Sequence, residues 1–309
     1  GPGEAQCAIA ALASPTVRTA SLVLDHASGL EIRALACLKY APSLHTLSLT
    51  ISGRWIGDTG AQGLASLKTA PALQSLTLHL QSNTLTAAAA QALSSLKHSF
   101  SLRQLTLNLQ GNNLRDLGTE ALGTLMDAPA LQILHLNLQH NHVGLAGAQG
   151  LASLRYTPML HTLSLSVGRN NIQDAGVQAL GTLAHAPFLQ VLNLDLALNN
   201  VGGAGAQALS QLKEMPHLHT LRLDLSSNRV GNVGAQAIAA LHRAPSLGML
   251  HLNLSGNFLS EAGAWALSRL KDAPALHTLH LDLAVNNVGD AGCQALSVLR
   301  EASLCALHL

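Results

Sequence analysis

The chain has 309 residues, a formal net charge of +1 and only 11% charged residues, against about 25% in an ordinary globular domain. This balance gives no support for binding to nucleic acid or to an anionic membrane surface. No apolar run approaches the ~18 residues that a membrane span requires, because the leucines are interrupted at every second position.

The first 41 residues are irregular. We predict a helix over residues 4–15, followed by a short strand over residues 21–24 in a unit that lacks the turn asparagine of later units. Residues 1–41 are therefore expected to hold an N-terminal helix and a short first repeat.

From residue 42 to residue 303 the sequence repeats every 29 residues. A proline precedes each strand segment on this register, with Phe100 as the exception: Pro42, Pro71, Pro129, Pro158, Pro187, Pro216, Pro245 and Pro274. A period this strict indicates a solenoid. We expect residues 42–303 to form regular repeats and residues 304–309 to be the strand of a truncated final repeat, all within one continuous domain.

One repeat shows why the chain should curve. In residues 218–230, Leu221, Leu223 and Leu225 alternate with polar residues, which predicts a strand with one buried face. Residues 234–245 place apolar residues at helical spacing and end in a proline, which predicts a helix of two to three turns. Strands lie about 4.8 Å apart and helices need roughly 10 Å, so the strands must line the concave side.

These residues resemble the leucine-rich repeats of the ribonuclease-inhibitor-like class. The resemblance is carried by the strand pattern, by the 29-residue length and by turns such as Asn-Asn-Val-Gly-Asp-Ala-Gly at residues 286–292. It implies an α/β horseshoe with a parallel sheet on the concave face and helices on the convex face. Here an additional x-Leu pair precedes the asparagine, for example at residues 194–196, so we expect a longer strand and a broader concave face. The family is a set of interaction scaffolds that share no partner.

One asparagine recurs at the turn of almost every repeat. Turn backbone groups that enter the core need partners, and an amide side chain can both donate and accept a hydrogen bond. We predict a structural role for this asparagine column, which consists of Asn83, Asn112, Asn141, Asn170, Asn199, Asn228, Asn257 and Asn286.

The outward positions of the strands form two further columns. The first of these reads Ser48, Thr77, Thr106, His135, Ser164, Asn193, Arg222, His251, His280 and, in the final strand, His308. The other reads Thr50, His79, Asn108, Asn137, Ser166, Asp195, Asp224, Asn253 and Asp282. Aspartate, histidine and arginine gather in the C-terminal half, and no aromatic residue is present for stacking on sugars or single-stranded nucleic acid. We predict a partner site formed by Asp195, Arg222, Asp224, His251, Asn253, His280 and Asp282.

No phosphate loop, nucleophile motif, acid/base pair in a pocket or cofactor motif is visible. We therefore predict a non-catalytic scaffold that binds a protein partner on the concave face. One alternative is a metal- or pH-responsive surface, because His251, His280 and Asp282 offer three zinc ligands. In that surface, aspartates would favour charged histidines, and an acidic partner would bind more tightly as the pH falls towards ~6. A second alternative is a GTPase-activating-type accessory, although no position matches such a motif.

The C-terminal strand segment has no polar cap after it, and solenoids need caps at both ends. We expect the chain to be part of a longer protein, and we expect its uncapped strand to permit end-to-end self-association. Cys293 stands where other repeats carry buried alanine or valine, and no cysteine cluster flanks the array, so we expect an intracellular, cytoplasmic location.

Overall fold

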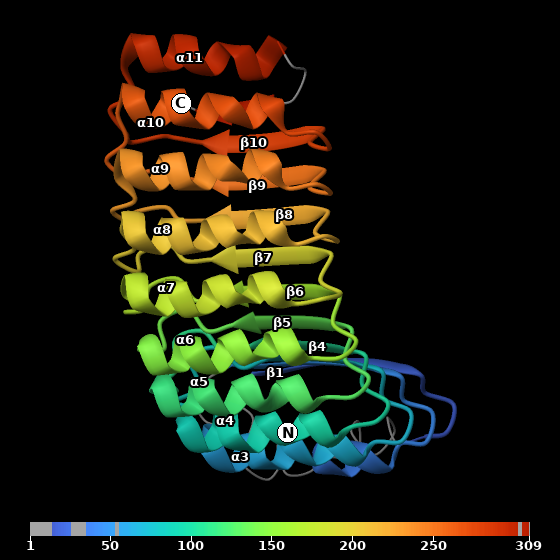
Figure 1. The fold of residues 1–309 in the computed structure, drawn as a ribbon. Helices are drawn as coiled ribbons and strands as arrows, with labels where there is room; N and C mark the ends of the chain where they lie inside the picture. The colour runs from blue at the N-terminus through green and yellow to red at the C-terminus, as the bar shows by residue number, and fades with distance from the viewer. Residues whose placement is uncertain (1–13, 26–34, 53–55, 302–304, 309) are drawn as a thin grey trace.

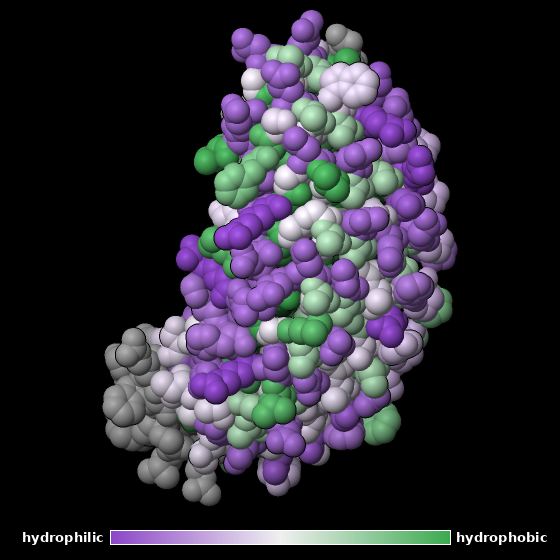
Figure 2. All heavy atoms as spheres, turned by 60° about the vertical axis from the view of Figure 1, so that its left-hand side comes forward, coloured by the Kyte–Doolittle hydropathy of each residue, from purple (hydrophilic) through white to green (hydrophobic). Residues whose placement is uncertain are grey.

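The computed structural model describes residues 14–25, 35–52, 56–301 and 305–308. The helix predicted over residues 4–15 lies outside these ranges, except for its last two residues. Within the described residues, eleven parallel strands follow one another in chain order in a single sheet, and helices cover one of its faces (Figure 1). The predicted α/β solenoid, with the sheet on its concave side, is confirmed, and Figure 2 shows its crescent outline.

The strands are β1 (Thr19–Asp25), β2 (Thr46–Ser52), β3 (Ser75–His79), β4 (Gln104–Asn108), β5 (Ile133–Asn137), β6 (Thr162–Ser166), β7 (Val191–Asp195), β8 (Thr220–Asp224), β9 (Met249–Asn253), β10 (Thr278–Asp282) and β11 (Cys305–His308). Strands β3 to β10 have five residues each, yet their pairing extends further. The N–H of Leu225, for example, donates to the carbonyl of Asn253 at 2.9 Å. The additional x-Leu pair is therefore part of the paired sheet, and its leucine, such as Leu225, is buried.

The α-helices are α3 (Gly57–Ala65), α4 (Ala87–Ser94), α5 (Arg115–Gly123), α6 (Leu145–Ala152), α7 (Gln173–Gly181), α8 (Gly203–Leu209), α9 (Gly231–Ala239), α10 (Glu261–Leu267) and α11 (Gly289–Glu301). The 3-10 helices are η1 (Ala36–Tyr40), η2 (Ser66–Thr69), η3 (Ser95–His98), η4 (Thr124–Asp127), η5 (Ser153–Tyr156), η6 (Thr182–His185), η7 (Ser210–Glu214), η8 (Ala240–Arg243) and η9 (Ser268–Asp272). From α3 to α10 each α-helix passes directly into a 3-10 turn. The residue before the repeat proline, such as Ala244 with ψ of 122°, is then extended because proline disfavours helical backbone before it.

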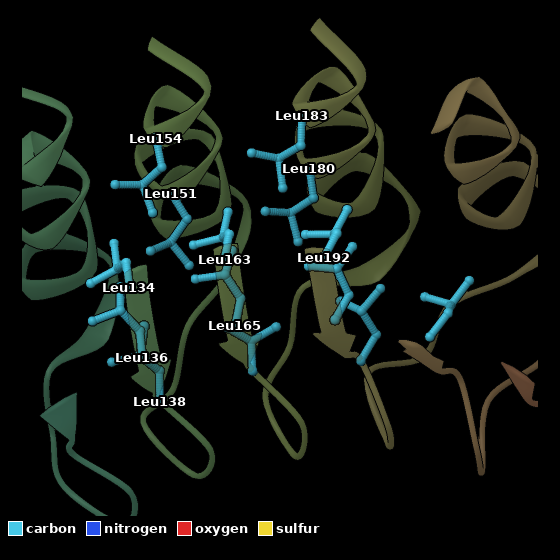
Figure 3. Packing of buried hydrophobic residues seen from close by; sticks show 14 of the residues in the cluster. Leu134, Leu136, Leu138, Leu151, Leu154, Leu163, Leu165, Leu180, Leu183 and Leu192 are labelled. Carbon is cyan, nitrogen blue, oxygen red and sulfur yellow. The ribbon is translucent and has the colours of Figure 1, made fainter. Parts of the chain in front are cut away.

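Leucines from the strands and from the helices fill the space between the two layers. In Figure 3, Leu134 and Leu136 of β5 and Leu163 and Leu165 of β6 point towards the helices, from which Leu151 meets them. All of these side chains are at most 1% exposed. Burial of one such leucine contributes about 1.5–3 kcal/mol, so the 29-residue period builds one continuous core.

The turn asparagine joins its own repeat to the preceding repeat through hydrogen bonds. The Asn228 Oδ1 accepts from the backbone N–H groups of Asn199 and Val201, both at 3.0 Å. Its Nδ2 donates to the carbonyls of Leu196 at 3.0 Å and Leu225 at 2.9 Å. The same pattern recurs along the asparagine column, for instance at Asn112, Asn141, Asn199, Asn257 and Asn286.

The capping of the helix N-termini alternates from one repeat to the next, so its period is two repeats. The 29-residue period of the sequence does not predict this alternation. The Asp116 carboxylate in the first turn of α5 accepts hydrogen bonds from the N–H groups of Gly144 at 2.6 Å and Gly147 at 3.0 Å, at the start of α6. Asp174 of α7 caps α8 in the same way. A Cβ at Gly147 would lie 2.8 Å from the Asp116 Oδ1, so a larger residue here would require the Asp116 side chain to shift. One repeat therefore supplies the cap that the next repeat lacks.

The C-terminal end differs from expectation in two respects. Strand β11 pairs so that Ala306 lies opposite His280, and His308 lies opposite Asp282. The predicted row of His251, His280 and His308 is therefore wrong for His308. A register shift of two residues keeps the inward and outward faces unchanged, so the leucine pattern could not decide between the registers. Cys293 is exposed and not buried, because no helix packs on the outer side of α11 in the described chain.

Among the described residues, no helix is both long and apolar enough to cross a membrane. Within the same residues, β11 pairs only with β10. Association of copies through the other edge of β11 stays a prediction.

Candidate functional site

A hollow of about 270 Å³ lies on the concave face over β8, β9 and β10. Its polar lining consists of Arg222, Asp224, His251, Asn253, His280 and Asp282, above the leucines at positions 223, 252 and 281. These are six of the seven residues that the sequence columns predict. The parallel register brings them together, because it sets Arg222 beside His251 and His251 beside His280.

The seventh predicted residue, Asp195, does not line the hollow. It lies on β7 next to Asp224, where its carboxylate accepts hydrogen bonds from the N–H of Ala197 at 3.0 Å and from the Nε2 of Gln139. Burial raises the pKa of Asp195, and the nearby Asp224 carboxylate adds to this, while the two hydrogen bonds oppose it. Asp195 thus has its carboxylate engaged within the sheet.

The two histidines of the hollow stack on each other. The ring centroids of His251 and His280 are 4.1 Å apart, and the ring planes differ by 12°. Burial lowers the pKa of His251, and the positive charges of His280 and Arg222 lower it further. The expectation that the aspartates would favour a charged His251 is therefore wrong, because burial and two cationic neighbours disfavour its charged form. The described residues contain no group of three His, Cys, Asp or Glu side chains placed to hold a metal ion.

The lowered pKa of His251 predicts a pH dependence of stability. A histidine whose pKa is lower in the folded state contributes stability above its unfolded pKa, near 6.5, and this contribution is lost as the pH falls below that value. We expect the melting temperature to fall between pH 7.5 and pH 5.5, and we expect His251→Asn to reduce this fall. Thermal denaturation followed by circular dichroism measures the melting temperatures of both proteins. An equal fall in both would contradict the assignment of the pH dependence to His251.

The aspartate column also terminates the strands. The Asp224 Oδ1 accepts the N–H of Ser226 at 2.8 Å, and the Asp282 Oδ1 accepts the N–H of Ala284 at 2.9 Å. Asn253 accepts from Ser255 in the same way, at 3.0 Å. These are Asx turns, in which a side chain bonds the backbone two residues further on. The recurrence of Asn or Asp at this position was the sequence signal for this second role.

Arg222 carries a positive charge that has no partner within the described residues. It is exposed, and neither an ion pair nor a hydrogen bond joins its guanidinium to a described side chain. The neighbouring Asn193 side chain has a buried Oδ1 that also lacks a described hydrogen-bond partner. The second Asp224 oxygen accepts only a long bond of 3.3 Å from the Asn253 amide. The hollow therefore combines an unpaired guanidinium with carboxylates that keep acceptor capacity.

A comparison with protein-family models agrees with the repeat pattern. A family model described as Leucine Rich repeat matches residues 103–123, 133–152, 160–181, 187–210, 217–239 and 275–297. The solved structures that resemble the chain include an internalin from Listeria monocytogenes, with 16% sequence identity and a TM-score of 0.48. That alignment covers 98% of this chain and 88% of the internalin chain. A comparison with curated protein sequences finds no match.

Proposed function

We propose that this leucine-rich repeat protein is a non-catalytic scaffold that binds a protein partner at the C-terminal half of its concave face. The observation that carries the proposal is the hollow over β8 to β10, in which the unpaired guanidinium of Arg222 lies beside Asp224. A solvated sheet needs no such set, since Ser48 and Thr77 occupy the corresponding outward positions in the N-terminal half.

The two rows of the hollow define the chemistry of the partner. Arg222, His251 and His280 form a row of hydrogen-bond donors, and Asp224, Asn253 and Asp282 form a parallel row of acceptors two residues further along each strand. Two residues of a strand span roughly 7 Å. A partner segment with acidic and basic side chains about this far apart would pair with both rows.

Paired variants that keep the fold test the proposal. Asp224→Asn retains the oxygen that accepts the N–H of Ser226 and removes only the charge, so it should leave stability almost unchanged. We expect the amount of partner captured by the double variant Arg222→Ala/Asp224→Asn to fall by about tenfold or more, because charge-assisted hydrogen bonds contribute ~1.5–3 kcal/mol each. Affinity capture with quantitative mass spectrometry measures this amount.

The control is Ser48→Ala/Thr77→Ala in the N-terminal half of the same face, which should capture the partner as the unmodified protein does. The reverse result would place the site in the N-terminal half. If both variants captured as much partner as the unmodified protein does, the proposal that the partner binds the concave face would be wrong.

Two further properties are part of this proposal. The 29-residue repeat supports the ribonuclease-inhibitor-like subclass. The exposed, free thiols of Cys37 and Cys293 support function in a reducing, intracellular compartment. Neither a metal-dependent surface nor a GTPase-activating role gains support from the described residues, and neither is proposed.

A further inference from the structure

A second cavity opens at the edge where the strands end. It has a volume of about 550 Å³ and is lined by Gly256, Phe258, Leu259, Ser260, Val285, Asn286 and Asn287. These residues belong to the turns that follow β9 and β10, so the rim pocket, as we call it, lies beyond the C-terminal ends of two of the strands that carry the concave hollow. Figure 2 views this edge and shows apolar side chains standing out at its upper left among polar ones.

The two large apolar side chains of the rim pocket are not explained by the fold. Phe258 is 76% exposed and Val285 is 88% exposed, so neither stabilises the core. Both residues have left-handed backbone, with φ of 60° and 57°. This conformation is unfavourable for non-glycine residues and is a clear outlier for a β-branched valine.

Other repeats fill these two turn positions differently. The position of Phe258 holds Trp55 in the first regular repeat and polar residues in the others: Thr84, Asn113, His142, Asn171, Asn200, Arg229 and Asn287. The position of Val285 holds Ser82, Gly111, His140, Arg169, Leu198, Ser227 and Gly256. An exposed phenylalanine and an exposed valine therefore occur together in adjacent turns, at positions where the backbone favours asparagine or glycine.

Gly256 leaves space between them. It occupies the Val285 position one repeat earlier, with φ of 63°, and a Cβ built on it would lie 3.6 Å or more from its neighbours in Ser227. The absence of a side chain here leaves room beside Phe258 and Val285 for a side chain from another molecule. Such a side chain must be apolar to gain from burial against both.

We propose that the rim pocket receives an apolar side chain from a linear segment of a protein, and that this segment continues onto the concave hollow. This inference rests on the proposed function. Asp282 lies three residues before Val285, and the aspartate row is nearer to the rim than Arg222 is. The segment therefore carries, in order from the rim, an aromatic or large aliphatic residue, a basic residue facing Asp224 and Asp282, and an acidic residue facing Arg222.

The experiment selects ligands from a displayed library of random 16-residue peptides on the unmodified protein. The rim variant Phe258→Asn/Val285→Asn is matched to the fold, because asparagine tolerates left-handed backbone. Its melting temperature should be unchanged or higher. The enriched peptides should carry the apolar, basic and acidic residues in this order or its reverse, according to chain direction. They should bind the rim variant at least tenfold more weakly.

The outcomes separate this inference from the proposed function. Peptides that bind the rim variant normally, but lose binding to Arg222→Ala/Asp224→Asn, would overturn the rim pocket and leave the concave site. Peptides unaffected by either variant would overturn both. If no enriched peptide depends on the rim residues, the proposal of a linear ligand is wrong. If the molar mass in light scattering changes only in the rim variant, the pocket binds a second copy of this chain.

Discussion

Replacing Asn228 by alanine should lower the free energy of unfolding by about 3 kcal/mol or more. The substitution leaves the buried N–H groups of Asn199 and Val201 without this acceptor. It also removes one donor from each of the carbonyls of Leu196 and Leu225, which keep only their bonds from the neighbouring turn asparagines. Each unsatisfied buried group costs ~1–3 kcal/mol. Because the affected groups belong to two neighbouring repeats, the loss should also reduce the coupling between them.

Arg229→Ala provides the matched control at the adjacent position. The Arg229 side chain is exposed, and its backbone N–H bond to Val201 at 2.8 Å is retained after the substitution. Its effect should stay within about 0.5 kcal/mol. Urea denaturation of both variants measures the difference, and similar losses at the two positions would show that the asparagine amide does not hold the turns.

The architecture was predictable because it depends on a period. Leucine at every second position and proline every 29 residues determine which residues are buried, and this holds whatever the outward residues are. The position of the hollow was also predictable, since parallel strands in constant register place equivalent residues side by side. Six of the seven predicted site residues line it for that reason.

Features that depend on the balance between neighbours were not predictable in the same way. Proximity to aspartate suggested a charged His251, but burial and two cationic neighbours lower its pKa. The register of β11 was misjudged because a shift of two residues preserves the alternation of faces. Asp116 and Asp174 cap helices of the next repeat, and this alternation is visible only when the sequence is compared at a spacing of two repeats.

The glycines on the convex side set how closely adjacent helices can approach. Gly123 at the end of α5 faces Gly150 of α6, and a Cβ on Gly123 would lie only 2.2 Å from the Gly150 carbonyl oxygen. That atom belongs to the backbone of a packed helix and cannot rotate away. The contact explains why a residue with poor helix propensity lies within two consecutive helices.

Gly123→Ala should therefore destabilise the protein, although the same change in an unconstrained helix usually gains up to ~1 kcal/mol. Forcing α5 and α6 apart disturbs the leucines beneath them, and overpacking of this kind costs ~1–3 kcal/mol. We expect a net loss of about 2 kcal/mol. Gly203→Ala at the start of α8 is the control, because its Cβ would make ordinary contacts of 3.6 Å, and its effect should be neutral or slightly stabilising. Denaturant titration measures the free energy of unfolding of both variants. Stabilisation by both substitutions would mean that α5 and α6 lie further apart than described.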